Sequence, residues 1–315
     1  MKAVVTGGAG FIGSHLVEEL LAEQFEVHII DNLVSGKQKH VNPQAIFHLA
    51  DISSEQIKPL IVDIRPDVVF HLAAQADVQR SIQNPGYDAM VNLVATIYLL
   101  EACRDAAVSK FIFASTSAVY GNLQKEQIVE TDPTCPISYY GISKYSAESY
   151  IRVFHQLYGL PYTILRYGNV YGPRQTPKGE GGVVAVFMER IQKGTPLTIH
   201  GDGEQTRDFV YVKDVVRANV AAMKRGEQEI IHVSTANRTS INDLARLLTE
   251  FHEADLPIIH SLAREGDIKH SNLDNRKGLE CLGWQPKYEI RAGLEETYQS
   301  YINEMYESKR DAKGT

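Results

Sequence analysis

The sequence has few cysteines and no hydrophobic run long enough to span a membrane. Its 315 residues include three cysteines, Cys103, Cys135 and Cys281, which lie far apart and form no C-x-x-C pair. This number and spacing favour neither a disulfide framework nor a zinc site. A membrane helix needs about 18 consecutive apolar residues, and no apolar stretch approaches that length. We therefore expect no metal ion and no membrane partner.

Positive charge is also scarce. The chain has 32 lysines and arginines against 39 aspartates and glutamates, a net charge of −7, and no long basic run. Nucleic acid is therefore not an expected partner. The apolar stretch from Val4 is short and leads into glycines, so we expect no signal peptide and take the cytoplasm as the default location.

Short apolar runs alternate with longer amphipathic stretches in the first half of the chain. The runs are AVVTGG, EVHIID, AIFHLAD, DVVFHLAA, KFIFAST and YTILRYGNVYG, and the amphipathic stretches include 14–23, 91–107 and 143–158. Continuous apolar strands separated by helices predict an α/β fold with a doubly wound parallel sheet. Beyond about residue 172 the strands are shorter and interrupted. We expect a second, smaller α/β domain there, not contiguous in sequence.

Four glycines follow the first apolar run. Gly7, Gly10 and Gly13 have the spacing G-x-x-G-x-x-G, with Gly8 beside the first. At a turn from strand to helix, such glycines permit a tight turn and the close approach of a pyrophosphate, and the helix N-terminus attracts the phosphates. A tight turn without a ligand would also use glycines. The expected strand before the motif and helix after it favour a dinucleotide site.

An acidic residue at the end of the second expected strand supports this interpretation. Asp31 lies 18 positions after Gly13, about where an acid that binds the adenosine ribose belongs. Its carboxylate would accept hydrogen bonds from the ribose hydroxyls and repel a 2′-phosphate. NAD is therefore favoured over NADP, although a solvated acid at a strand end is the simpler alternative.

A tyrosine and a lysine share one helix face in the segment SYYGISKYS. Tyr140 and Lys144 are four residues apart, whereas Tyr139 is five residues before Lys144 and points elsewhere. A tyrosine with its usual pKa of about 10 is a poor base at neutral pH. A nearby ammonium favours the phenolate, so Tyr140 becomes a candidate proton acceptor. The spacing alone is common by chance, but here it follows a dinucleotide loop.

Together these motifs resemble one enzyme family. From residue 1 to about 290 the chain is similar to the extended short-chain dehydrogenase/reductases, and within them to the nucleotide-sugar epimerases, most closely the bacterial UDP-glucose 4-epimerases. The resemblance rests on TGGAGFIG, DNLVSG, HLAAQ, FASTSAVYG, YYGISK, LRYGNVYGPRQ, GDGEQTRDFVYVKD and AREGDI.

The resemblance implies an NAD-dependent isomerase that inverts C4 of a UDP-sugar through a 4-keto intermediate. Its catalytic residues would be Tyr140, Lys144 and Thr116, with Ser115 and Ser117 beside the threonine. NAD would be bound by Gly7, Gly10, Phe11, Ile12, Gly13, Asp31, Asn32, Ser35, Gly36, Asp51, Ile52, Leu72, Ala73, Ala74, Gln75, Tyr140, Lys144 and Tyr167. The UDP-sugar would be bound by Thr116, Asn169, Val183, Val184, Phe187, Thr198, Ile199, His200, Arg207, Arg264, Asp267 and Ser271.

The resemblance also implies the domain boundaries and the assembly. Residues 1–168, with a return around 208–230, would form the NAD-binding Rossmann domain. Residues 169–207 and 231–305 would bind the UDP-sugar, and 306–315 would be a frayed tail. Relatives pair through the helix that carries the tyrosine and lysine and the helix before it, and the former has more apolar residues here than one core-facing stripe requires. We therefore expect a homodimer.

Related activities remain as alternatives. A nucleotide-sugar 4,6-dehydratase would carry an acid after the strand-end threonine, but Ser117 and Ala118 follow Thr116 here. The UDP-glucuronate and UDP-N-acetylglucosamine 4-epimerases are closer competitors. The familiar glucose/galactose enzymes carry a lysine where this chain has Ala76, so contacts to the sugar differ. A non-catalytic NAD sensor is a further alternative, against which Thr116, Tyr140 and Lys144 argue.

Overall fold

A seven-stranded parallel sheet forms the larger part of the molecule. The structure is a computed structural model that describes residues 1–177, 182–252, 256–263 and 269–311. The sheet has the strand order β11-β6-β5-β4-β1-β2-β3. Its strands are β1 (Lys2–Thr6), β2 (Glu26–Asp31), β3 (Ile46–Leu49), β4 (Val68–His71), β5 (Lys110–Thr116), β6 (Tyr162–Tyr167) and β11 (Glu229–Val233). All six neighbouring pairs are parallel, which confirms the expected doubly wound fold.

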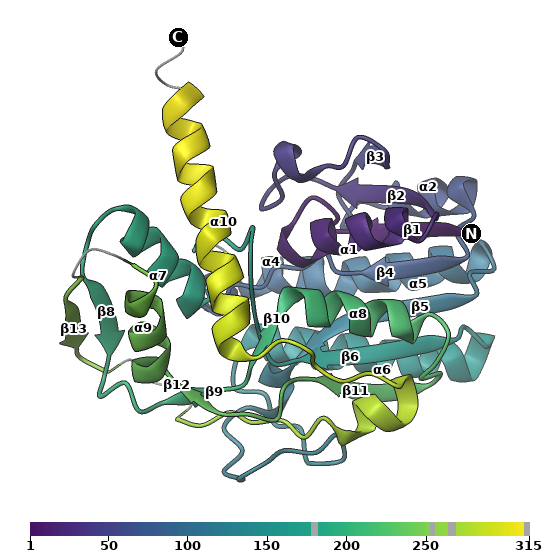
Figure 1. The fold of residues 1–315 in the computed structure, drawn as a ribbon. Helices are drawn as coiled ribbons and strands as arrows, with labels where there is room; N and C mark the ends of the chain where they lie inside the picture. The colour runs from purple at the N-terminus through teal and green to yellow at the C-terminus, as the bar shows by residue number, and fades with distance from the viewer. Residues whose placement is uncertain (178–181, 253–255, 264–268, 312–315) are drawn as a thin grey trace.

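Helices cover both faces of this sheet because alternate strand residues point to opposite sides. On one face, Val5 packs against α1 (Phe11–Ala22) and α8 (Val212–Ala222). On the other, Val4 packs against α2 (Ile57–Ile64), α5 (Ala95–Asp105) and α6 (Tyr139–Tyr158). Figure 1 shows α1 and α8 together on the face towards the viewer. The strands are apolar throughout because both faces are buried.

Short helices lie between β2 and β3, between β4 and α5, and between β5 and α6. They are η1 (Gln38–His40), α3 (Val78–Gln83), α4 (Pro85–Ala89), the π-helix η2 (Met90–Val94) and η3 (Ser117–Tyr120). The amphipathic stretch expected at 91–107 is therefore divided between η2 and α5. The stretch expected at 143–158 starts earlier, because Ser138 caps α6 by accepting a hydrogen bond from the backbone N–H of Gly141 at 3.1 Å.

A third apolar cluster lies beyond the large sheet. It is built from α7 (Val183–Gln192), β8 (Leu197–His200), α9 (Ile241–Glu250) and α10 (Ile290–Asp311), together with β7 (Asn169–Tyr171) and β10 (Phe209–Tyr211). The remaining elements are β9 (Thr206–Arg207), β12 (Thr239–Ser240), β13 (Ile258–Ser261) and the π-helix η4 (Gly278–Leu282). Figure 1 shows α7, α9, β8 and β13 beside the long helix α10 and away from the large sheet.

Three boundaries differ from the sequence expectation. The apolar run 162–172 forms two strands, because the chain leaves the large sheet at Gly168 and β7 pairs with β10 instead. β11 is an edge strand of the large sheet through its pairing with β6, so that sheet extends past residue 230. The segment expected to fray at 306–315 is helical as far as Asp311. Among the described residues, no helix has both the length and the apolar character to cross a membrane.

Candidate active site

The glycine loop connects β1 to α1 at the point where the strand order reverses. Gly7 has φ +73°, and a Cβ there would lie 2.8 Å from the backbone nitrogen of Ala73 after β4. At Gly13 a Cβ would overlap the carbonyl oxygen of Gly7. Side chains at these positions would push the first turn of α1 away from the sheet. The turn has no side-chain cap at Gly10 and no acidic residue, so its free N–H groups suit a phosphate.

Asp31 closes one end of this cleft. Its Oδ2 accepts a hydrogen bond from the backbone N–H of Ala9 at 3.0 Å, and its Oδ1 accepts one from that of Leu33 at 2.8 Å. Burial raises the pKa of Asp31, which these two bonds oppose. A Cβ at Gly36 would lie 2.7 Å from Oδ1, so the following loop folds over the carboxylate. Each carboxylate oxygen retains acceptor capacity for a ribose hydroxyl.

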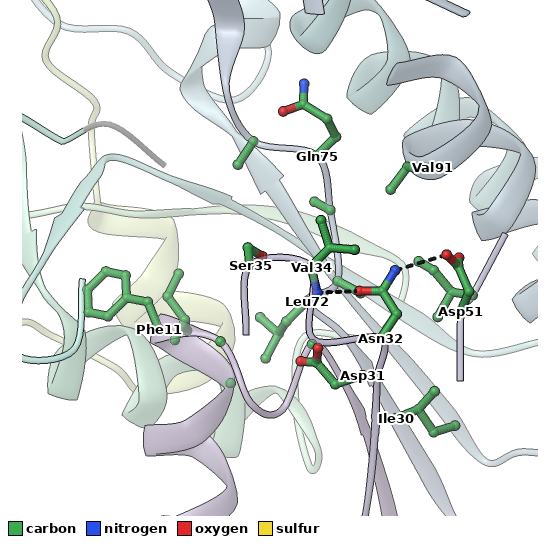
Figure 2. A pocket seen from close by; sticks show the side chains of 18 of the residues that line it. Phe11, Ile30, Asp31, Asn32, Val34, Ser35, Asp51, Leu72, Gln75 and Val91 are labelled. Carbon is green, nitrogen blue, oxygen red and sulfur yellow. Dashed lines mark hydrogen bonds between the residues drawn. The ribbon is translucent and has the colours of Figure 1, made fainter. Parts of the chain in front are cut away.

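The neighbouring residues Asn32 and Asp51 complete this end. Figure 2 shows the Asn32 side chain between Asp51 and the backbone of Val34, and Asn32 Nδ2 donates to Asp51 Oδ2 at 2.9 Å. Nearly all the residues expected on the dinucleotide loops line this first cleft: Gly7, Gly10, Phe11, Ile12, Gly13, Asp31, Asn32, Ser35, Asp51, Ile52, Leu72, Ala73, Ala74 and Gln75. Gly36 instead lies behind Asp31.

A second cleft contains the candidate catalytic residues. Thr116, Tyr140, Lys144 and Tyr167 line it, whereas Tyr139 is 49% exposed and does not. The two clefts share the residues Phe11, Ile12, Leu72, Ala74 and Ala76. They are therefore two parts of one continuous site. A ligand in the first cleft can extend to the tyrosine and lysine in the second.

Lys144 lies four residues after Tyr140 in α6 and lines the same cleft. Its side chain is 2% exposed, and Nζ donates to the carbonyl oxygen of Ala114 in β5 at 2.9 Å. Burial lowers the pKa of Lys144 to about 8, while the charges of Asp88 and Glu148 act in the opposite direction. A Cβ at Gly141 would lie 2.7 Å from the carbonyl oxygen of Ala118. This contact places the first turn of α6 against η3, directly after Thr116.

The expected substrate residues divide into four groups. Those that line the second cleft with Thr116 are Asn169, Val183, Val184, Arg207 and Ser271. Phe187 and Ile199 are buried in the third apolar cluster, and Thr198 and His200, on the other face of β8 from Ile199, are partly exposed outside the described lining. Arg264 and Asp267 lie outside the described residues. Successive side chains of a strand point to opposite faces. Because Ile199 of β8 points into the core, its neighbours Thr198 and His200 point away from it.

The clefts also contain residues that the motifs did not single out. Arg174 lines the first cleft and donates to Ser14 Oγ in the first turn of α1 at 3.1 Å, and Gln175 and His270 line the second. The segment GPRQ was recognised only as part of the family pattern. Its separate role needs the fold, because more than 150 residues separate Arg174 from Ser14. In the described parts of the chain, no group of three or more His, Cys, Asp or Glu side chains could hold a metal ion.

A buried ion pair supports the strand end beside the catalytic residues. Arg166 of β6 donates from Nε and Nη2 to the two carboxylate oxygens of Glu148 in α6, at 2.9 and 2.6 Å. Ser115 Oγ donates to the same carboxylate at 2.5 Å. The two charged side chains are 3% and 0% exposed. This pair connects β5, β6 and α6 immediately below Thr116.

Comparison with known proteins gives one consistent family. The model of the NAD dependent epimerase/dehydratase family matches residues 3–234. A crystal structure of UDP-glucose 4-epimerase with UDP-glucose from Thermotoga maritima is similar, with 45% identity, 97% of this chain and 100% of that chain covered and a TM-score of 0.94. UDP-glucose 4-epimerase from Thermus thermophilus, in complex with NAD, has 41% identity, 96% and 99% coverage and a TM-score of 0.91.

A relative named for another sugar is also similar. It is the UDP-N-acetylglucosamine 4-epimerase from Methanobrevibacter ruminantium M1 in complex with UDP-N-acetylmuramic acid. Its identity to this chain is 36%, with 96% of this chain and 98% of that chain covered and a TM-score of 0.91. The likeness of fold therefore extends over relatives with different sugars, and the sugar has to be argued from the site.

The buried pair predicts a large loss of stability when one partner is neutralised. Glu148→Gln leaves Arg166 charged and buried without a counter-ion, so the free energy of unfolding should fall by about 3–5 kcal/mol. The matched control is Glu18→Gln, whose ion pair with Arg174 has the same 2.6 Å distance but side chains 44% and 24% exposed. An exposed pair contributes at most about 1 kcal/mol. Equal losses in urea unfolding of the two variants would contradict the prediction.

Proposed function

The chain belongs to the NAD dependent epimerase/dehydratase family, and we propose that it interconverts UDP-glucose and UDP-galactose by inverting C4 of the sugar. The observation that carries this function is the continuity of the two clefts, which brings a dinucleotide loop to Tyr140, Lys144 and Thr116. NAD is the cofactor. The glycine loop and the uncapped start of α1 fit its pyrophosphate, and the carboxylate of Asp31 can accept hydrogen bonds from its adenosine ribose.

The proposed roles follow from position. NAD, when bound, supplies the acceptor and later the donor of the hydride at the sugar carbon. Tyr140 as phenolate takes the proton of the 4-hydroxyl and later returns it to the keto oxygen. Thr116, whose Oγ1 accepts from the backbone N–H of Ala118 at 3.1 Å, donates its own hydroxyl proton towards the sugar oxygen. Lys144 supplies the positive charge that favours the phenolate and contacts the nicotinamide ribose.

Binding of the UDP part is assigned to the second half of the chain. We assign NAD binding to residues 1–168 with a return from about 208 to the end of β11 at Val233, and UDP-sugar binding to 169–207 and the residues after β11 as far as 305. Asn169 and Arg207 line the cleft where the diphosphate would lie, and arginine suits phosphate geometry. Val183 and Val184 begin the helix that covers the nucleotide, with Phe187 and β8 behind them. Binding energy placed on the nucleotide leaves the sugar free to turn.

Elimination of water is not favoured by this site. A 4,6-dehydratase needs an acid beside the sugar, but Ser117 and Ala118 follow Thr116 in η3. The described lining of the second cleft contains no Asp or Glu side chain. Tyr140, Lys144 and Thr116 are sufficient for proton exchange at one oxygen. Epimerisation without elimination therefore fits the described residues better.

We also propose a homodimer formed through α6. Ile142, Tyr150, Val153 and Leu157 of this helix are between 45% and 67% exposed, while Ile151 on its other face is buried against the sheet. An apolar face of this kind on a surface helix favours association. Light scattering with gel filtration should give about twice the chain mass, and a value near one chain mass would contradict the proposal.

We also propose a cytoplasmic location. The three cysteines are free thiols, and free thiols are typical of the reducing cytoplasm.

Replacing Tyr140 tests the catalytic assignment. Tyr140→Phe removes the proton acceptor, so turnover of UDP-galactose should fall at least about 100-fold while substrate affinity changes little. The matched control is Tyr139→Phe, because Tyr139 is the preceding residue in the same helix and lies outside the cleft. Its turnover should stay within about twofold of the unmodified protein. Similar losses in the two variants would show that the pair has been assigned in the wrong register.

The small residue Ser271 predicts acceptance of N-acetylated sugars. Ser271 and Ala76 both line the second cleft, and their short side chains leave space beside the sugar for an acetamido group. We therefore expect the protein to epimerise UDP-N-acetylglucosamine in addition to UDP-glucose. In Ser271→Tyr, overpacking of about 1–3 kcal/mol should lower turnover of the N-acetylated sugar roughly 5- to 150-fold and spare the glucose form. Equal losses on both substrates would reject this assignment.

A further inference from the structure

Asp88 is a fully buried carboxylate that the proposed reaction does not use. It lies in α4, is 1% exposed, and accepts hydrogen bonds from three side chains on three different segments. Its Oδ1 accepts from Gln75 Nε2 at 2.9 Å and from Asn92 Nδ2 at 3.1 Å. Its Oδ2 accepts from Ser143 Oγ at 2.6 Å. Every donor is neutral.

The charge of Asp88 has no direct counter-ion. No ion pair joins it to a cation within the parts of the chain that the structure describes, whereas the equally buried Glu148 is paired with Arg166. A buried carboxylate without a cation is costly, and a purely structural role could be met by an uncharged amide. The charge of Asp88 is therefore best explained by a cationic group that it stabilises from a longer distance.

The hydrogen bonds of Asp88 connect the cofactor cleft to the catalytic turn. Gln75 lines the first cleft, and Asn92 secures it further by exchanging two bonds of 2.9 Å with its backbone. Asn92 lies in the π-helix η2, a local distortion that is frequent at functional sites. Ser143 lies between Tyr140 and Lys144 in α6 and also donates to the carbonyl oxygen of Tyr140 at 3.0 Å. One carboxylate thus joins the wall of the first cleft to the helix that carries the reacting groups.

We propose that Asp88 is a positioning residue for the reaction: it holds the Gln75 segment against the first turns of α6, and its buried negative charge stabilises the ammonium of Lys144. The proposal rests on the proposed function, because it assigns Asp88 a role through the lysine of that site. Asp88 itself touches neither the sugar nor the reacting atoms.

The groups around Lys144 decide the expected direction of the effect. Burial lowers the pKa of Lys144 to about 8, and Asp88 of α4 and Glu148 of α6 raise it. Arg166 neutralises much of the effect of Glu148. His71 of β4 is fully buried, and burial and the charge of Lys144 lower its pKa, so it stays neutral. Tyr140 lines the same cleft as Lys144, and the positive charge of the Lys144 ammonium favours the phenolate form of the tyrosine. Without the Asp88 charge, the pKa of Lys144 falls, and the ammonium is lost at lower pH.

Asp88→Asn removes the charge and keeps the shape. The amide oxygen can still accept from Gln75 and Asn92, and the amide nitrogen can donate to Ser143 Oγ, which retains the Tyr140 carbonyl as its own acceptor. We expect the alkaline limb of the kcat profile to move to lower pH by about one unit, so that the activity of the variant relative to the unmodified protein falls about ninefold at pH 9 but only about twofold at pH 7. Ser143→Ala is the control: it removes one hydrogen bond, keeps the charge and should leave the alkaline limb in place.

A second measurement does not depend on the substrate. Cyanate carbamylates neutral amines, so its reaction with Lys144, followed by peptide mass spectrometry across pH, reports the protonation of this lysine directly. Half-maximal labelling should occur at lower pH in Asp88→Asn than in the unmodified protein. If the unmodified protein epimerises no UDP-sugar, the proposed function fails while labelling still tests the charge effect.

Three results would overturn the proposal. The first is an unchanged alkaline limb together with an unchanged labelling profile in Asp88→Asn. The second is an equal shift of the alkaline limb in Ser143→Ala. The third is that neither Asp88→Asn nor the smaller Asp88→Ser gives folded protein, because the carboxylate would then be required for folding and not for the charge of Lys144.

Discussion

The close approach of two backbones at the centre of the sheet determines where chemistry can occur. The chain places β1 beside β4 at the point where the strand order reverses, and Gly7 lets the loop after β1 lie against Ala73 after β4. Ligands of open α/β sheets bind at such a reversal, beyond the carboxyl ends of the strands. Because Gly13 then permits α1 to start against the same loop, the positive end of the helix faces the cleft. A side chain at either glycine would separate these elements and remove the cofactor site.

Burial gives the second half of the site its chemical character. Lys144 lies in an almost dry position between β5 and α6, where its charge acts strongly on Tyr140 but is itself difficult to maintain. The surrounding carboxylates reduce this difficulty without forming an ion pair with the lysine. Arg166 and Glu148 hold the strand end on one side, and Asp88 holds the wall of the first cleft on the other. The proton acceptor is thereby placed next to the cofactor groove, and the residues that the two clefts share are all apolar.

Local patterns were sufficient to predict the parallel sheet, the glycine loop and Asp31, and the resemblance to the epimerases implied most of the other residues of the first cleft. The glycine spacing, Asp31 and the apolar strands each depend on residues close in sequence. The pattern could not show that β11 joins the large sheet, since this requires pairing with a strand more than 60 residues earlier. Asp88, Arg174 and Glu148 were missed for the same reason. They resemble ordinary charged helix or loop residues until the fold brings Ser143, Ser14 and Arg166 against them.

The central claim is that the two clefts form one site in which hydrogen leaves C4 of the sugar and returns to the same carbon. UDP-galactose carrying deuterium at C4 tests this claim directly. Incubated with the NAD-loaded protein in ordinary water, it should give UDP-glucose that retains deuterium at C4. Replacement of the deuterium by solvent hydrogen, or its release in free reduced cofactor, would contradict the account.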